Sequence, residues 1–243
     1  MKPTSNLSLE LTEELLGSWG AEEATAEDII IPKMLLMHGQ SERVLQGEKG
    51  QGDLVRSTDW ETLAKRNDTV AVIPFTMTKT WRVSEMVDGK PQWRREETYD
   101  ATKGDLPWDF TENGKPMRRD KALNFYVLPV AEAELPTAFP MKLQFLRTSF
   151  KAGKVLADHF AKCKMLNKPP AVLSFEIGSE FVNGDKQKYF VFTAKTGKPT
   201  NIVQISACKR WYDLMKTQNH AIKEHEVNDV PAASTDAAST DEF

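Results

Sequence analysis

The middle of the chain carries stretches of β-branched and apolar residues that predict β-strands. Residues 69–78, Thr-Val-Ala-Val-Ile-Pro-Phe-Thr-Met-Thr, form the clearest stretch, and this strand is expected to continue to Val83. Asp88-Gly89 and Asn183-Gly184-Asp185 stand between such stretches, and both are typical of hairpin turns. Further strands are expected at residues 92–99, 122–130, 141–148, 171–182 and 188–194. The pattern therefore predicts a body made mainly of strands.

Helical spacing occurs in two places of this body. Residues 149–166 begin at Ser149, a favourable N-cap, and place Leu156 and Cys163 on one face. A last helix is expected over residues 203–224. Trp60–Arg66 predicts one helical turn, and residues 100–120, which are polar and rich in Gly and Pro, predict a long exposed loop.

The order of these elements favours a mainly β fold. Several strands, one helix and a closing hairpin follow the order of a five-stranded OB barrel, in which the helix falls between strands three and four. We therefore expect an OB-like five-stranded barrel elaborated with hairpins, with one helix between strands and a C-terminal helix. An α+β open antiparallel sheet is the alternative.

Charge divides the 243 residues into three parts, although the formal net charge is only −3. Residues 1–28 hold one base and seven acids and are expected to form a short acidic helix, over residues 7–16, and a linker. Residues 29–225 hold 31 bases and 23 acids and predict one basic domain. Residues 226–243 hold five acids and no base, and their Pro, Ala, Ser and Thr content predicts a disordered acidic tail.

The composition argues against several classes of protein. No apolar run approaches the length of a membrane helix, and the first residues lack the apolar core of a secretory signal. Cys163 and Cys208 form no Cys-x-x-Cys pair, so neither structural zinc nor a disulfide framework is expected, and the cytoplasm is the expected location. Residues 196–200 lack the first glycine of a phosphate loop, and the four histidines are scattered. No enzyme activity, metal or cofactor is predicted.

Aromatic and basic residues alternate between positions 81 and 121, which is typical of single-stranded DNA binding. Aromatic rings cover the faces of unstacked bases, while Arg and Lys follow the phosphates. The residues expected to stack on bases are Trp81, Trp93, Tyr99 and Trp108. Those expected to contact phosphates are Arg82, Arg94, Arg95, Arg118, Arg119 and Lys121, with Lys151 and Lys154 on the predicted helix. The alternative is that Trp81 and Trp93 form a cross-strand pair in the core.

The acidic tail ends in Asp241, Glu242 and Phe243. A terminal Phe beside carboxylates is expected to fill an apolar pocket of a partner, while the acids pair with a basic rim. A basic OB-like body followed by such a tip resembles the single-stranded DNA-binding proteins of bacteria and bacteriophages. The stretch 146–151, the Pro-Pro pair at 169–170 and the hairpin at 183–185 look more like the bacteriophage version. The tip departs from the bacterial pattern because it lacks Pro before Phe.

This resemblance implies sequence-independent binding and protection of single-stranded DNA in phage replication and recombination, within the cytoplasm of the bacterial host. The tail would then recruit replication or recombination proteins. Two alternatives stay open. One is a single-strand annealing recombination protein, which would assemble into a homo-oligomer. The other is a phage structural or regulatory protein that does not bind DNA.

Overall fold

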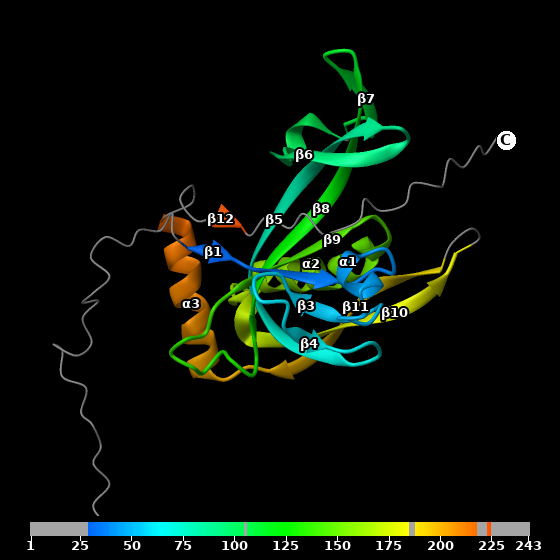
Figure 1. Ribbon diagram of the computed structural model, residues 1–243. Coiled ribbons are helices and arrows are strands. Elements are labelled where there is room, and N and C mark those ends of the chain that lie inside the picture. Colours follow the sequence, from blue (N-terminus) through cyan, green and yellow to red (C-terminus); the bar gives the residue numbers. More distant parts are fainter. Residues whose placement is uncertain (1–28, 105, 185–187, 218–222, 225–243) are drawn as a thin grey trace, which may run out of the picture.

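The computed structural model describes residues 29–104, 106–184, 188–217 and 223–224 (Figure 1). The acidic helix expected at residues 7–16 and the tip Asp241, Glu242 and Phe243 lie outside the described residues. The strands are β1 (Ile30–Ile31), β2 (Lys33–Leu36), β3 (Leu54–Arg56), β4 (Thr62–Ala64), β5 (Thr69–Val87), β6 (Lys90–Thr98), β7 (Asp109–Glu112), β8 (Lys115–Pro129), β9 (Met141–Leu146), β10 (Leu173–Asn183), β11 (Lys188–Pro199) and β12 (Lys223–Glu224). The helices are α1 (Glu42–Leu45), α2 (Phe150–Met165) and α3 (Ile202–Thr217), with 3-10 turns η2 (Ala101–Lys103), η3 (Arg147–Ser149) and η4 (Pro170–Val172).

Most of these strands belong to one mixed ten-stranded sheet, so the mainly β class is confirmed. Its order is β11-β10-β5-β8-β9-β2-β3-β4, with β6 added beside β5 and β7 beside β8. The pairs are antiparallel except β2–β9, which is parallel. Among the described residues no ladder joins β4 to β11. The sheet is therefore open where a barrel would be closed.

The two ends of the sheet approach each other through side chains instead. Ser179 of β10 donates a hydrogen bond from Oγ to the carbonyl of Gly52 at 2.6 Å. Gly52 has φ +92°, and a Cβ there would lie 2.7 Å from the ring of Phe190. Only glycine tolerates both this backbone conformation and this close approach. The contact joins β10 and β11 to the loop that precedes β3.

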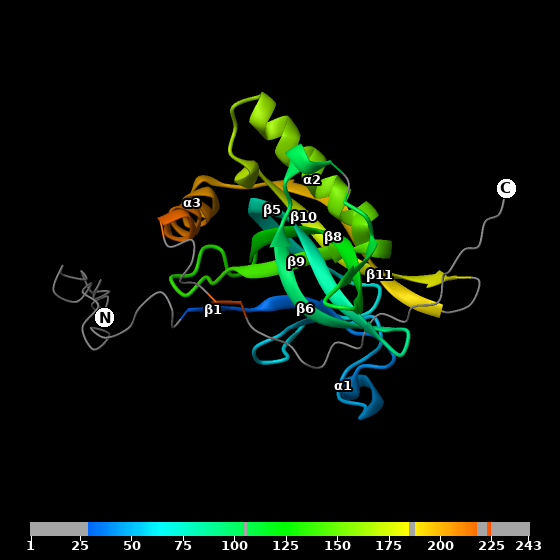
Figure 2. The ribbon, with the colours of Figure 1, turned by 90° about the horizontal axis from the view of Figure 1, so that it is seen from above.

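Two helices cover opposite faces of the central strands β5 and β8. Helix α2 packs against the larger core, where its Gly153 lies against Phe145 and its Leu156 is fully buried. Helix α3 packs Ala207 and Cys208 against the second core, which contains Ile73. Figure 2 shows the two helices on different sides of the strands. No helix in the described ranges is long and apolar enough to cross a bilayer.

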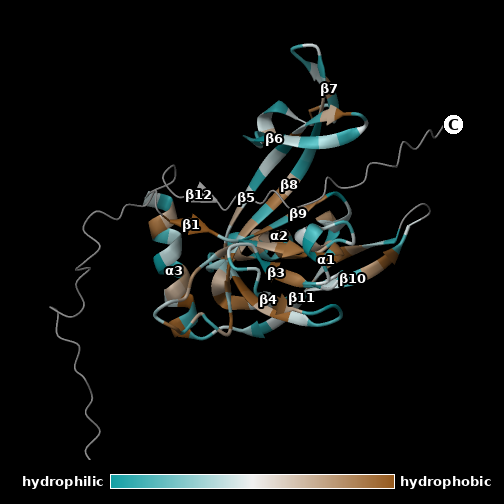
Figure 3. Cartoon of the chain, viewed as in Figure 1, coloured by the Kyte–Doolittle hydropathy of each residue, from teal (hydrophilic) through white to brown (hydrophobic). Residues whose placement is uncertain are grey.

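Beyond the body, the outer halves of β5 and β8 continue as a four-stranded arm, defined here as residues 80–122 without residue 105. Its strand order is β6-β5-β8-β7. The arm projects from the body in Figure 1, and Figure 3 shows β6 coloured mostly as hydrophilic. Tight turns close its two outer hairpins, at Asp88-Gly89 (φ 51° and 73°) and Asn113-Gly114 (φ 52° and 75°). These positive angles are those of the turns that hairpins prefer.

The described residues correct three predictions of local structure. The long exposed loop expected at residues 100–120 is wrong, because η2, β7 and the start of β8 occupy it. The helical turn expected at Trp60–Arg66 is wrong, because residues 62–64 pair with β3 as strand β4. The last helix, expected to reach position 224, is described as far as Thr217, and residues 223–224 form strand β12 instead. Helix α2 and the hairpins at Asp88-Gly89 and between β10 and β11 are confirmed.

Candidate nucleic-acid interface

The strand register divides the side chains of the arm between two faces. Residues paired directly across neighbouring strands lie on the same face of a sheet. Trp93 of β6 pairs with Ser84 of β5, which pairs with Arg118 of β8. Arg82 of β5 pairs with Asp120 of β8 and lies on the same side. We call this side the Trp93 face and the opposite side the Arg95 face.

A β-bulge in β6 places Trp93 on its face. Arg95 pairs with Val83 and Trp93 pairs with Ser84, so Arg94 is an extra residue between them. In a regular strand, Trp93 and Arg95 would point to the same side. The bulge reverses this relation, as such insertions commonly do. Trp93 remains 48% exposed as a result.

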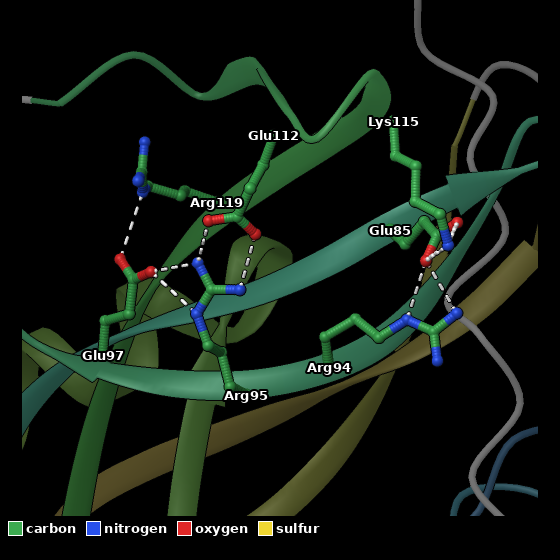
Figure 4. A network of polar contacts seen from close by, with 7 residues as sticks. All are labelled: Glu85, Arg94, Arg95, Glu97, Glu112, Lys115 and Arg119. Carbon is green, nitrogen blue, oxygen red and sulfur yellow. Dashed lines mark hydrogen bonds and ion pairs between the residues drawn. The ribbon is translucent and has the colours of Figure 1, made fainter.

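Ion pairs neutralise most of the cations on the Arg95 face (Figure 4). Arg95 donates to Glu112 at 2.8 and 2.9 Å and to Glu97 at 2.7 and 3.0 Å. Arg119 Nε lies 3.3 Å from Glu97. The hydrogen bond from Arg95 holds the pKa of Glu112 below its usual value. Arg95 and Arg119, expected on phosphates, therefore bind carboxylates of the arm itself.

A second ion-pair cluster lies near the outer end of the arm. Arg94 donates to Glu85 at 2.7 and 2.9 Å, and Lys115 lies 3.0 Å from the same carboxylate. Hydrogen bonds from Lys115, which has the larger effect, and from Arg94 lower the pKa of Glu85. Arg94 is thus also paired within the arm, which weakens its assignment as a phosphate contact.

Trp81 is buried, so the expectation that it stacks on a base is wrong. Its side chain is 3% exposed, and its ring centroid lies 5.5 Å from that of Tyr99. The amine of Lys121 lies 4.2 Å from the Tyr99 ring centroid and 5.9 Å from that of Trp81. Trp81 pairs with Lys121 on the face that continues along β8 into the core at Leu123. The alternative of a Trp81–Trp93 core pair is equally wrong, since Trp93 lies on the opposite face.

Trp108 is exposed, but it does not lie on the Trp93 face. Its side chain is 56% exposed, and its carbonyl accepts the N–H of Arg119 at 2.6 Å. The next residue, Asp109, pairs with Arg118. Trp108 precedes β7, and its bond to Arg119 continues the β7–β8 pairing by one residue, which puts Trp108 on the Arg95 face with Arg119.

The remaining predicted cations are spread over other elements. Lys151 and Lys154 are exposed on helix α2 of the body, and the amine of Lys154 lies 5.7 Å from the ring of Phe150. The structure therefore brings together Arg82, Trp93 and Arg118 from the predicted set, on one face of the arm.

Two residues that the sequence did not single out belong to this face. Asp120 is 4% exposed and accepts two hydrogen bonds from Arg147, at 2.8 and 2.6 Å. Arg147 follows β9, 27 positions along the chain from Asp120. No local sequence pattern marks such a distant pair. In the structure, Arg147 stands out by its positive φ of 43°. No group of three His, Cys, Asp or Glu able to hold a metal occurs in the described part of the chain.

A hollow of about 390 Å³ lies away from the arm, at the start of α3. Glu176, Lys198, Asn201 and Gln204 are among its polar lining residues. Asn201 and Gln204 exchange backbone-to-side-chain hydrogen bonds that cap the helix, and both donate to Glu134. These bonds satisfy the helix terminus, so the hollow does not compete with the arm as a candidate site.

Comparison of the sequence with models of protein families finds no match, and comparisons with curated proteins and with solved structures find none either. The geometry of the arm therefore carries the functional argument alone.

Proposed function

We propose that the protein binds single-stranded DNA along the Trp93 face of the arm. The observation that supports this most is the row formed by Trp93, Ser84 and Arg118 across three strands. It places a half-exposed indole and a guanidinium on one side of an open sheet. Neighbouring strands are about 4.8 Å apart, so the two side chains start about 10 Å from each other.

The chemistry of this row suits an unstacked nucleotide. An indole covers the flat face of any base, which gives about 1–3 kcal/mol per base without reading the sequence. A guanidinium beside it contacts the phosphate. On the opposite face, Arg95 and Arg119 are paired with Glu97 and Glu112, so this face attracts a polyanion less strongly. The proposal thus assigns DNA to one face of the arm.

The proposal also includes the finer predictions from the sequence. The curled body would be an elaborated OB-like domain, supported by the position of α2 between β9 and β10. The tip Asp241, Glu242 and Phe243 would recruit replication or recombination proteins, supported by its sequence alone. Binding without catalysis in the cytoplasm of a bacterial host, in phage DNA replication, follows from the same resemblance.

The test is the affinity for a labelled oligo-dT, measured by fluorescence anisotropy for Trp93→Ala and Trp108→Ala. Both changes remove an exposed indole from the arm, and they differ in the face affected. Trp93→Ala should weaken binding by about 1–3 kcal/mol, or roughly 5–150-fold. Trp108→Ala should leave it nearly unchanged.

A third variant separates stacking from packing. Trp93→Phe keeps a flat ring and should retain most of the affinity, whereas Trp93→Leu keeps apolar volume and should lose it. Circular dichroism of each variant reports whether the arm folds. Equal losses in Trp93→Ala and Trp108→Ala, or full affinity in folded Trp93→Leu, would refute the assignment.

A further inference from the structure

Two guanidinium groups contact one buried carboxylate on the Trp93 face, and a third belongs to the residue opposite it on the neighbouring strand. Arg147 holds Asp120 by two hydrogen bonds, from Nε to Oδ1 at 2.8 Å and from Nη2 to Oδ2 at 2.6 Å. Arg118 Nε approaches the same Oδ1 at 3.7 Å. Arg82 lies directly opposite Asp120 in the β5–β8 register. The cluster therefore contains three cations against the single anion at its centre.

The hydrogen-bond donors of this cluster outnumber its acceptors. A guanidinium carries five N–H donors and no acceptor, whereas a carboxylate offers two oxygens. Arg118 Nε is buried and has no hydrogen-bond partner. Among the described residues, the Arg82 side chain makes no hydrogen bond and no ion pair within 4 Å, although Asp120 and Glu96 interact with its charge. Buried donors without acceptors are rare in proteins, and an oxyanion would supply the missing acceptors.

The other carboxylates near the cluster do not fill this role. Glu96 lies opposite Arg82 in the β5–β6 register, but it accepts hydrogen bonds from Lys142, at 3.3 Å, and from Gln144, at 2.8 Å. Asp109 lies opposite Arg118 on the exposed strand β7 and makes no ion pair within 4 Å with a described residue. Burial and the neighbouring charge of Arg147 lower the pKa of Arg82, while Asp120 and Glu96 raise it.

The backbone at Arg147 fixes the third guanidinium in place. Its φ of 43° is a left-handed conformation that residues with a side chain seldom adopt. Such strain persists where surrounding contacts over-determine the position, and it occurs often at binding sites. Here the two bonds to Asp120 supply that constraint, and Asp120 in turn prevents the cations from simply repelling each other.

We propose that Arg82, Arg118 and Arg147 form a binding site for a tetrahedral oxyanion, the phosphate group. Guanidinium groups bind phosphate oxygens in pairs, with short charge-assisted hydrogen bonds. Trp93 lies in the same cross-strand row as Arg118, so the site holds the phosphate next to the base stacked on Trp93. The identification of this phosphate as that of a DNA strand rests on the proposed function, whereas the oxyanion site itself does not.

The test follows the Nε–H signals of arginines in the nitrogen-15-labelled full chain by NMR. Inorganic phosphate and oligo-dT are titrated separately, with sodium chloride at matched ionic strength as the reference. Both ligands should shift the Arg82 and Arg118 signals in a saturable manner. Arg82→Gln should abolish this saturation and reduce the salt slope of oligo-dT binding by about 0.7, the value for one phosphate contact on a single strand.

Arg66→Gln is the matched control. Arg66 is exposed and precedes β5, and Arg82 lies about 40 Å further along that strand at the usual rise per residue. This variant removes the same charge and should leave both titrations unchanged. If phosphate shifts Arg66 as much as Arg82, or if Arg82→Gln and Arg118→Gln keep the full salt slope, the site is refuted.

The two ligands separate this inference from the proposed function. Saturable binding of inorganic phosphate without binding of oligo-dT supports the oxyanion site and contradicts DNA binding. Oligo-dT binding that depends on Trp93 but not on Arg82 or Arg118 supports DNA binding and contradicts the oxyanion site.

Discussion

Replacement of Asp120 by Asn should destabilise the fold and strengthen DNA binding at the same time. Asp120 is 4% exposed and its partner Arg147 is 22% exposed, so solvent screens this pair poorly. Asn keeps one carbonyl oxygen, but it presents an NH₂ group to the guanidinium where the second oxygen was. One of the two bonds, at 2.8 and 2.6 Å, is therefore lost together with the negative charge.

The expected loss of stability lies between two reference values. A hydrogen bond to a charged group contributes about 1.5–3 kcal/mol, and removal of one partner of a buried ion pair costs about 3–5 kcal/mol. Asp120→Asn should thus reduce the free energy of unfolding by about 2–4 kcal/mol. For a domain of this size the melting temperature falls by about 2–4 °C per kcal/mol, so a decrease of about 5–15 °C is expected.

The affinity should change in the opposite direction. Asp120 repels a phosphate bound by Arg82 and Arg118, and unit charges about 4 Å apart interact by about 1 kcal/mol even in water. Removal of the charge should therefore tighten oligo-dT binding roughly fivefold at low salt. Asp213→Asn is the control, because it removes an equal charge from an exposed pair with Lys209 on α3. It should cost about 0.3–0.5 kcal/mol of stability and leave affinity unchanged.

Urea denaturation followed by circular dichroism gives the stability, and fluorescence anisotropy gives the affinity. An unchanged free energy of unfolding would show that the Asp120–Arg147 pair does not hold the cluster together. A folded Asp120→Asn protein with weaker DNA binding would show that phosphate does not bind beside Asp120. Either result would refute the reasoning for the cluster.

Two further predictions concern the arm and the core. Hydrogen bonds from Arg95 lower the pKa of Glu112, and those from Lys115 lower the pKa of Glu85. The two ionised carboxylates therefore stabilise the fold above their ordinary pKa of 4.5, and this stabilisation is lost as the pH falls through the lowered pKa values. The urea midpoint should decrease in that acidic range, and less steeply in Glu112→Gln; equal slopes would contradict this. Gly153→Ala should destabilise the protein by up to about 2 kcal/mol, because the new Cβ would lie 2.8 Å from Phe145, and overpacking costs about 1–3 kcal/mol against about 1 kcal/mol of helix propensity. Urea denaturation measures this loss; a more stable Gly153→Ala would contradict the packing.

The elements that the sequence predicted well are those with a local signal. Residues 69–83 were expected to form a strand and belong to β5, and residues 149–166 were expected to form the helix observed as α2. Apolar periodicity and turn residues mark both elements without reference to the rest of the chain. Residues 109–120 have no such mark, because most of their positions are polar and their few apolar residues do not alternate regularly.

The division of the candidate site between two faces could not be predicted locally. It depends on the bulge at Arg94, which turns Trp93 away from the face of Arg95. It depends also on ion pairs between residues far apart, such as Arg95 with Glu112 and Arg147 with Asp120. A sequence lists these charges but does not give the strand register, which pairs some of them closely and leaves the Arg82 side chain without an ion pair within 4 Å among the described residues.

We propose that single-stranded DNA binds to the exposed Trp93 indole and to the guanidiniums of Arg82 and Arg118 on the Trp93 face. The most direct test compares the affinities of the full chain for labelled oligo-dT and for a duplex of equal length, at several salt concentrations. We expect much tighter binding of the single strand, with log K falling against log salt by about 0.7 for each phosphate contacted. Equal affinity for the duplex, or no binding of either DNA at low salt, would contradict it.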